Sequence, residues 1–187
     1  MAHLGVEVLP SIDREVETTG PRKFVVLGTI EPRKNHQLLL DVWDDLARTG
    51  ALEPLPELHI IGKRGWMNED VFKRLDKGQS GVFEHGSLDD GELAKFLAKS
   101  DALLFPSLAE GYGLPALEAA SAGLPVICSD IDVFQELLAD IALFVPEPTV
   151  AAWKNTIAEF CTSKIPPERD NVARIPRWNS HFRHVFG

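Results

Sequence analysis

The sequence predicts an α/β fold in which helices cover both faces of a parallel β-sheet. From Phe24 onward, short apolar runs alternate with segments of helical periodicity, which is typical of strands and helices in turn. Most of these runs are apolar at every position, as expected for strands that are buried on both faces. The chain has 187 residues with 44% hydrophobic and 25% charged positions, so we expect one globular domain of ordinary size.

Four-residue apolar cores mark the expected strands. His59, Glu84 and His85 are the polar exceptions within them. In chain order, these strands are Phe24–Leu27, Leu58–Ile61, Val82–His85, Ala102–Phe105, Pro125–Cys128 and Ala142–Val145.

The clearest helix spans Asn35–Thr49. Apolar residues recur there with the period of a helix, and Gly50 follows as a stop signal. A second helix is expected within Ser87–Ser100, because Ser87 or Asp89 can cap its N-terminus and acidic residues occupy its first turn. Further helices are expected at Asn68–Asp76, from Pro115 to Gly123, and at Phe134–Leu138, Thr149–Cys161 and Trp178–Phe186.

Charge and composition exclude several classes of protein. The chain has 28 acidic and 19 basic residues, and a net charge of −9 argues against a nucleic-acid partner. Its two cysteines, Cys128 and Cys161, form no C-x-x-C pair, which fits a reducing compartment. No apolar run approaches the roughly 20 residues of a membrane span, and the N-terminus lacks the layout of a signal peptide. We therefore expect a cytoplasmic protein without a membrane span.

A glycine loop follows the expected strand that ends at Phe105. Gly111 and Gly113 let the backbone approach a ligand closely, and the N–H groups at the start of the next helix favour a phosphate. Taken alone, this glycine pair fits an ordinary turn better. Two glutamates bracket the loop, however, and Glu118 lies in an apolar helix where a carboxylate needs a partner. The hydroxyl groups of a ribose or a sugar would supply one.

The segment from Glu110 to Ala119 reads Glu-Gly-Tyr-Gly-Leu-Pro-Ala-Leu-Glu-Ala. It resembles the E-G-F-G-L-P-x-L-E-A motif of retaining glycosyltransferases of the GT-B fold, in particular family 4 (glycosyl transferases group 1). The resemblance extends over residues 24 to 160 and includes the runs at 27–35, 60–62, 85–88 and 122–127. It implies a Rossmann-like, nucleotide-binding half of a GT-B fold.

The same resemblance implies a domain division. Residues 1–21 resemble an interdomain linker, and residues 22–187 would form the nucleotide-sugar-binding domain. A GT-B enzyme needs a second, N-terminal domain that binds the acceptor, and we expect that domain to be absent from this chain. The isolated domain is therefore expected to transfer no sugar.

The resemblance also assigns the catalytic roles. It places Glu110 beside the donor sugar and Lys34 on the leaving diphosphate, whose growing negative charge needs a cation. The family has an arginine directly after the strand-ending glycine, where this chain has Thr29. Arg33 is the expected substitute.

The remaining donor contacts are expected along four segments of the chain. Glu118 would hold the ribose hydroxyls, and the base would lie against the second and third strand ends, with its identity open between GDP, UDP and ADP. His36 is either a phosphate contact or a surface residue, and Trp66 either stacks on a ligand or caps the core. The expected binding residues are Gly28, Thr29, Gly62, Lys63, His85, Gly86, Ser87, Leu88, Gly111, Tyr112, Gly113, Leu114 and Glu118.

No metal site and no cofactor are expected. Asp130 and Asp132 form a D-x-D, which binds manganese in the other major glycosyltransferase fold. Here they follow a buried strand and precede a short helix that they can cap. The six histidines include one close pair, His181 and His184, without acidic or cysteine partners at zinc-ligand spacing.

These observations predict the donor-binding domain of a hexosyltransferase. It would move a hexose, with mannose as one candidate, from a nucleoside-diphosphate sugar to a glycan or lipid-linked acceptor in polysaccharide biosynthesis, in the cytoplasm or at the membrane surface. One alternative is a non-catalytic nucleotide-sugar-binding module. The other is a Rossmann-type dehydrogenase domain, which fits poorly because the first strand is not followed by G-x-G-x-x-G.

Overall fold

The computed structural model describes residues 20–139 and 141–162. The expected linker at residues 1–21, apart from its last two residues, and the expected helix Trp178–Phe186 lie outside the described residues. Within the described part, no helix is long and apolar enough to cross a membrane.

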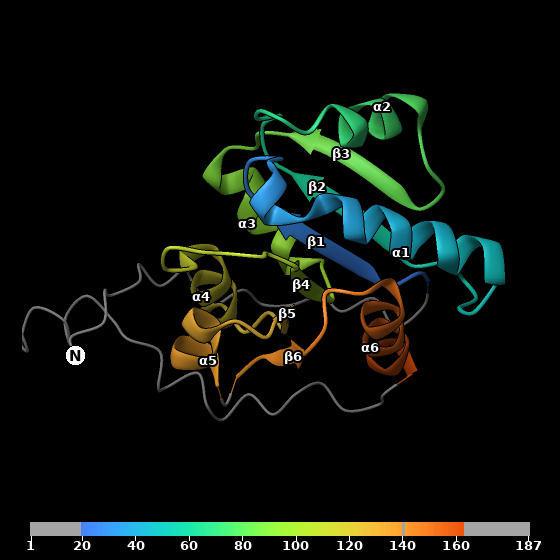
Figure 1. The fold of residues 1–187 in the computed structure, drawn as a ribbon. Coiled ribbons are helices and arrows are strands. Elements are labelled where there is room, and N and C mark those ends of the chain that lie inside the picture. Colours follow the sequence, from blue (N-terminus) through green and yellow to red (C-terminus); the bar gives the residue numbers. More distant parts are fainter. Residues whose placement is uncertain (1–19, 140, 163–187) are drawn as a thin grey trace, which may run out of the picture.

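Six parallel strands form one sheet in the order β3-β2-β1-β4-β5-β6 (Figure 1). All six coincide with expected strands to within one residue at either end. The strands are β1 (Lys23–Leu27), β2 (Glu57–Ile61), β3 (Val82–Gly86), β4 (Ala102–Phe105), β5 (Val126–Ser129) and β6 (Leu143–Val145).

The described residues form six α-helices and one 3-10 helix, of which the last α-helix follows the last strand and the others lie between strands. The 3-10 helix η1 (Pro32–Lys34) was not expected from the sequence. The α-helices are α1 (His36–Thr49), α2 (Glu69–Lys77), α3 (Asp90–Ala98), α4 (Leu114–Ser121), α5 (Asp132–Leu138) and α6 (Val150–Thr162).

The cap signals explain where the helices begin and end. Gly50 adopts the left-handed conformation (φ 58°) after α1, and its amide donates to the carbonyl of Leu46 at 3.0 Å, which confirms the expected stop. Asp89 forms a capping box with Glu92 at the start of α3. The expected aspartate caps of α5 are wrong, because the N-cap is Ile131 and no side chain caps this helix. Asp130 instead accepts a hydrogen bond from Gln135.

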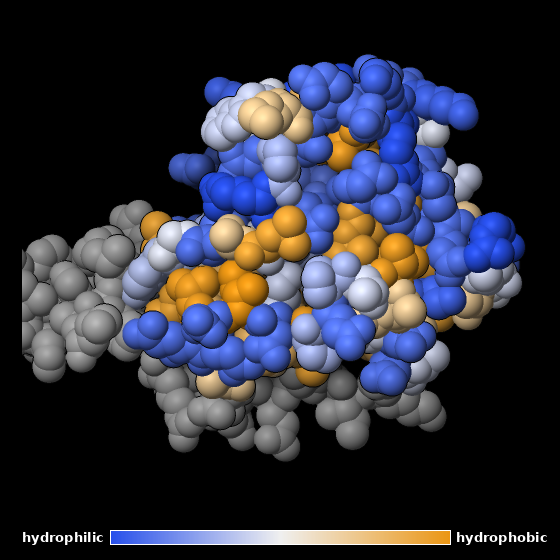
Figure 2. All heavy atoms as spheres, in the orientation of Figure 1, coloured by the Kyte–Doolittle hydropathy of each residue, from blue (hydrophilic) through white to orange (hydrophobic). Residues whose placement is uncertain are grey.

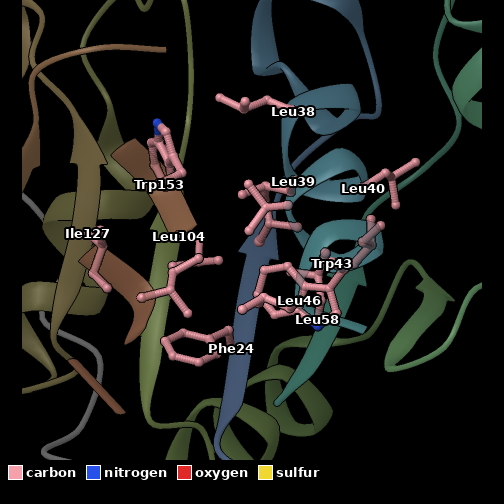
Figure 3. Close-up of a cluster of buried hydrophobic side chains, with 14 of the residues drawn as sticks. Phe24, Leu38, Leu39, Leu40, Trp43, Leu46, Leu58, Leu104, Ile127 and Trp153 are labelled. Atoms are coloured by element: carbon pink, nitrogen blue, oxygen red, sulfur yellow. The ribbon is translucent and has the colours of Figure 1, made fainter. Parts of the chain in front are cut away.

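Two hydrophobic layers hold the helices on the sheet. One layer joins α1, α2 and α6 to one face, and the other joins α3, α4 and α5 to the opposite face. Figure 3 shows the first layer, in which Trp43 of α1 and Trp153 of α6 meet side chains of the sheet such as Phe24 and Leu104. These four side chains are almost fully buried. The confirmed α/β fold is therefore a three-layer, Rossmann-like structure.

The surface differs between the two halves of the sheet. Figure 2 shows a mainly hydrophilic surface over α2 and β3, whereas apolar atoms gather over α4. The strand order reverses between β1 and β4, and in such sheets ligands bind beyond the carboxyl ends of the strands at the reversal. The loops after β1 and β4 are thus the first place to look for a site.

Candidate functional site

Two loops at the carboxyl edge of the sheet form a pocket. One follows β1 and contains η1, and the other follows β4 and leads into α4 (Figure 1). The amide of Leu108 donates to the carbonyl of Arg33 at 2.8 Å and ties the loops together. All lining residues except Glu31 and Pro115 were expected from the sequence. The pocket is lined by Gly28, Thr29, Glu31, Arg33, Lys34, Glu110, Tyr112, Gly113, Leu114 and Pro115.

The turn after β1 brings two cations to this pocket. Pro32 begins η1, where its fixed φ suits the first helical position. Asn35 then adopts a left-handed conformation (φ 54°), which asparagine tolerates better than most residues, and its amide donates to the carbonyl of Pro32 at 3.0 Å. The tight turn lets the adjacent Arg33 and Lys34 both reach Glu110.

Lys34 is a buried cation with two partners. Only 8% of its side chain is exposed, and its Nζ lies 2.6 Å from Oε1 of Glu110. The same ammonium group lies 4.3 Å from the ring centroid of Phe105, a cation–π contact. Gly28 lies beside this lysine, where its backbone conformation (φ +120°) favours glycine and a Cβ would just contact Cε of Lys34 at 3.4 Å. The aromatic ring and the carboxylate together hold the lysine in place.

The Glu110 carboxylate contacts both cations of the pocket. Its Oε1 accepts a hydrogen bond from the Ser107 hydroxyl at 2.8 Å, and its Oε2 accepts one from Nη1 of Arg33 at 2.8 Å. Burial raises the pKa of Glu110, but the contacts with Lys34, Ser107 and Arg33 outweigh burial and hold the pKa below its usual value. The carboxylate is therefore ionised at neutral pH.

Glu31 is a second carboxylate that the sequence analysis did not single out. It is 3% exposed, and its Oε1 lies 2.6 Å from Nε of Arg33, an ion pair whose angle falls outside hydrogen-bond geometry. Burial lowers the pKa of Arg33, but Glu110 and Glu31 outweigh it and raise the pKa. The signal for Glu31 was available in the sequence, as an acidic residue between a strand end and two basic residues.

The start of α4 forms the opposite wall of the pocket. Gly113 has φ +77°, and a Cβ there would lie 2.6 Å from Cε1 of Phe134, so both conformation and packing require glycine. Apart from its chain neighbours, no described atom lies within 4 Å of the position that a Cβ would take at Gly111. Packing within the described chain therefore explains Gly113 but leaves Gly111 unexplained.

Glu118 lies on the other side of Pro115. It is half-buried and lines a second depression with residues of α3 and α4, including Asp90, Leu93 and Leu97. Pro115 lines both depressions, so they adjoin each other. The two glutamates of the motif thus face neighbouring depressions and do not share one pocket.

The expected base-binding segments align at the ends of β1, β2 and β3. The amide of Gly62 donates to the carbonyl of Gly86 at 2.7 Å, and that of Gly28 donates to the carbonyl of Ile61 at 3.0 Å. A Cβ at Gly62 would lie 2.0 Å from the carbonyl oxygen of Gly28, so a larger residue does not fit. Gly62, Lys63, His85, Gly86, Ser87 and Leu88 line neither of the two depressions described above.

The ring of His85 belongs to a side-chain cluster on β2 and β3. Its Nε2 lies 2.9 Å from Nδ1 of His59, whose Nε2 lies 3.1 Å from Glu57, and both imidazole rings pack edge-on against Phe96. Burial lowers the pKa of His85 and of His59, so this pair is mainly neutral at pH 7. His85 is an exposed residue whose ring contacts His59 and Phe96.

The structure also decides two expectations about side-chain exposure. His36 is 1% exposed and is no surface residue, and neither ring nitrogen has a hydrogen-bond partner among the described residues. Burial, helped by the charge of Lys34, lowers the pKa of His36 to about 4, so this imidazole is neutral at pH 7. Trp66 is 63% exposed and does not cap the core.

Metal-ligating side chains do not gather in the part of the chain that the structure covers. No group of three or more His, Cys, Asp or Glu residues among residues 20–139 and 141–162 is placed to hold a metal ion. The cationic charge of the pocket comes from Lys34 and Arg33.

The fold is that of the Rossmann-like domains of GT-B glycosyltransferases. It is similar to the lipopolysaccharide outer core galactosyltransferase WaaB, with a TM-score of 0.75 and 22% identity over 98% of this chain and 53% of that chain. It is also similar to HepE from Anabaena, whose structure is in complex with UDP and glucose, with a TM-score of 0.73 and 17% identity over 88% of this chain and 47% of that chain.

Sequence comparisons identify the family. Residues 10–175 match the model of glycosyl transferases group 1, and the chain belongs to this family. It is 38% identical over 124 residues to the serotype-specific mannosyltransferase WbdA of Escherichia coli, covering 65% of this chain and 15% of that protein. It is 42% identical over 139 residues to the O-antigen chain mannosyltransferase RfbU of Salmonella typhimurium, covering 72% of this chain and 37% of that protein. The chain thus spans well under half the length of these relatives.

Proposed function

We propose that this chain is the donor-binding domain of a retaining hexosyltransferase that uses a nucleoside-diphosphate sugar. The observation that carries the proposal is the convergence of Lys34 and Arg33 on the buried Glu110, beside the start of α4 and at the reversal of the strand order. Among the relatives, WbdA and RfbU are named mannosyltransferases, which favours mannose as the hexose. A glycan or a lipid-linked glycan would be the acceptor.

In this proposal the two cations stabilise the leaving group. Departure of a sugar leaves additional negative charge on the terminal phosphate oxygen of the nucleotide, and cations placed there in advance lower the barrier. Lys34 suits this role because it is buried and fixed over Phe105, and Arg33 can offer two N–H groups to a phosphate. Glu110 would then lie beside the donor sugar.

The nucleoside would extend away from this pocket along the sheet. Glu118 would accept hydrogen bonds from the ribose hydroxyls in the adjoining depression. The base would lie toward Gly62, Lys63 and the turn at residues 85–88, where backbone groups dominate. Gly111 would leave space for the diphosphate, which accounts for a glycine whose Cβ position is open.

The proposal needs no bound metal and no cofactor. Two protein cations and the amides at the N-terminus of α4 would supply the positive charge that a metal supplies elsewhere. The donor itself is a substrate. Acceptor recognition would reside outside the region matched here, since the related mannosyltransferases extend well beyond it.

Calorimetry tests the proposal on the 187-residue chain. We expect one or more of GDP, UDP and ADP to bind, to bind more tightly than inorganic pyrophosphate, and to retain their affinity in EDTA. Lys34→Met should weaken that binding, whereas Lys73→Met, at an exposed lysine on α2, serves as the matched control. No detectable binding of any of the three nucleotides at millimolar concentration would refute the assignment.

A further inference from the structure

The cations that the proposed function assigns to the diphosphate are already occupied. Glu110 contacts Lys34 through Oε1 at 2.6 Å and Arg33 through Oε2 at 2.8 Å. Its side chain is 6% exposed, and Ser107 holds the same Oε1 at 2.8 Å. Both oxygens of one carboxylate are therefore used to bind the groups that would have to bind a phosphate.

Four side chains at this pocket form a cluster with no net charge. Glu31, Arg33, Lys34 and Glu110 carry formal charges that cancel. A diphosphate that enters this pocket meets a neutral cluster rather than two available cations. Glu110 occupies one of the three N–H donors of Lys34, and its negative charge repels a phosphate that approaches the same ammonium group.

We propose that the Glu110 carboxylate holds, in the free domain, the anion position that the donor diphosphate takes, and that Glu31 keeps Arg33 facing that position during the exchange. This inference rests on the proposed function for the identity of the incoming anion. It adds a step to donor binding, because the diphosphate displaces Glu110 from Lys34 and Arg33 and thereby frees the carboxylate to meet the sugar.

The surroundings of the cluster allow Glu110 to move while the cations stay. Lys34 keeps its contact with the Phe105 ring, and Arg33 keeps Glu31 on Nε and the backbone bond from Leu108. Glu110, by contrast, lies in a surface loop whose neighbours Ala109 and Gly111 are exposed. Apart from its chain neighbours, no described atom lies within 4 Å of the position that a Cβ would take at Gly111. Lys34 and Arg33 thus each keep a contact that does not involve Glu110, with Phe105 and with Glu31.

The test compares Glu110→Gln with Glu31→Gln. Each variant loses one of the two carboxylates that contact Arg33. Glu110→Gln removes the displaced anion, so it should bind inorganic pyrophosphate and the preferred nucleoside diphosphate about tenfold more tightly than the parent. Glu31→Gln removes the carboxylate that retains Arg33, so it should bind both ligands more weakly. Calorimetry gives each affinity, and circular dichroism with thermal unfolding shows that each variant is folded.

A general effect of negative charge on anion binding gives a different pattern. It would tighten binding in both Glu110→Gln and Glu31→Gln, and that result would overturn the proposal. An affinity of Glu110→Gln equal to or below that of the parent would overturn it as well. Ser107→Ala provides a second variant that keeps every charge, and loosening Glu110 in this way should tighten pyrophosphate binding about threefold.

The two probes separate this inference from the proposed function. If pyrophosphate follows the expected pattern but no nucleoside diphosphate binds more tightly than pyrophosphate, the exchange on Lys34 and Arg33 stands and the nucleotide assignment fails. If nucleoside diphosphates bind well but Glu110→Gln does not tighten them, the nucleotide assignment stands and the exchange fails.

Discussion

Replacing Lys34 by methionine should destabilise the fold and change its response to pH. Methionine retains an unbranched apolar side chain beside Phe105 but leaves Glu110 without its closest cation. Removing one partner of a buried ion pair costs roughly 3–5 kcal/mol when the other charge is left uncompensated. Ser107 and Arg33 still contact Glu110, so we expect a loss of about 2 kcal/mol in the free energy of unfolding at pH 7.

The stability difference between the parent and Lys34→Met should also depend on pH. The pKa of Glu110 in the folded protein lies below its usual value, so the unfolded state binds the proton more readily. The stabilisation is therefore present above the unfolded pKa of about 4.3 and is lost as the pH falls through the folded pKa. In Lys34→Met the folded pKa rises, so the difference in stability between parent and variant should narrow below about pH 4.

Urea unfolding of the parent, Lys34→Met, Glu110→Gln and the double variant would measure these effects. The double variant should recover part of the loss, because a neutral glutamine no longer needs the cation. Lys73→Met is the control, since Lys73 pairs with Asp70 at the surface and an exposed pair contributes about 0–1 kcal/mol. Equal losses in Lys34→Met and Lys73→Met, with additive effects in the double variant, would show that the buried pair contributes nothing to stability.

Three further predictions follow from single residues. Gly113→Ala should lower the free energy of unfolding in urea by about 2 kcal/mol, because Gly113 has a left-handed backbone and a Cβ there would clash with Phe134. Gly111→Ala should change it by less than about 0.5 kcal/mol, and equal losses in the two variants would contradict this account of packing. His36 has a folded pKa of about 4 against an unfolded value of about 6.5, so its protonation in the unfolded state should cost about 3 kcal/mol of stability as the pH falls from 6.5 to 4. His36→Leu should abolish that part of the pH dependence of stability, and an unchanged pH profile would assign it to another group. Glu118→Ala should weaken nucleoside-diphosphate binding about tenfold and leave pyrophosphate binding unchanged in calorimetry; equal weakening of both would remove Glu118 from the ribose.

Most of the fold could be predicted because its signals are local. The strands are buried on both faces, so each appears as a continuous apolar run, and α1 shows its buried stripe and its glycine stop. The 3-10 helix Pro32–Lys34 could not be predicted in this way, since three residues carry no period. The helix α5 was predicted, but its capping was not, since neither expected aspartate side chain caps it.

The candidate site was predicted in its residues but not in its contacts. Motif resemblance placed Glu110, Lys34 and Arg33 in one site, and the structure brings them together. Spacing along the chain could not show that Glu110 contacts both cations, because residues about 76 positions apart meet only through the sheet topology. Glu31 was missed although it lies two positions before Arg33, because the motif resemblance gives it no role. The burial of His36 could not be predicted either, because its sequence neighbours are charged and polar and only the packing around α1 buries it.

A crystal structure of this chain with a bound nucleoside diphosphate would test the account most directly. We expect the terminal phosphate within hydrogen-bond distance of Lys34 Nζ and Arg33, the ribose at Glu118, and the Glu110 carboxylate displaced from the position it holds 2.6 Å from Lys34 in the free domain. A nucleotide bound away from the loops after β1 and β4, with Glu110 still in contact with Lys34 and Arg33, would contradict both the site and the exchange.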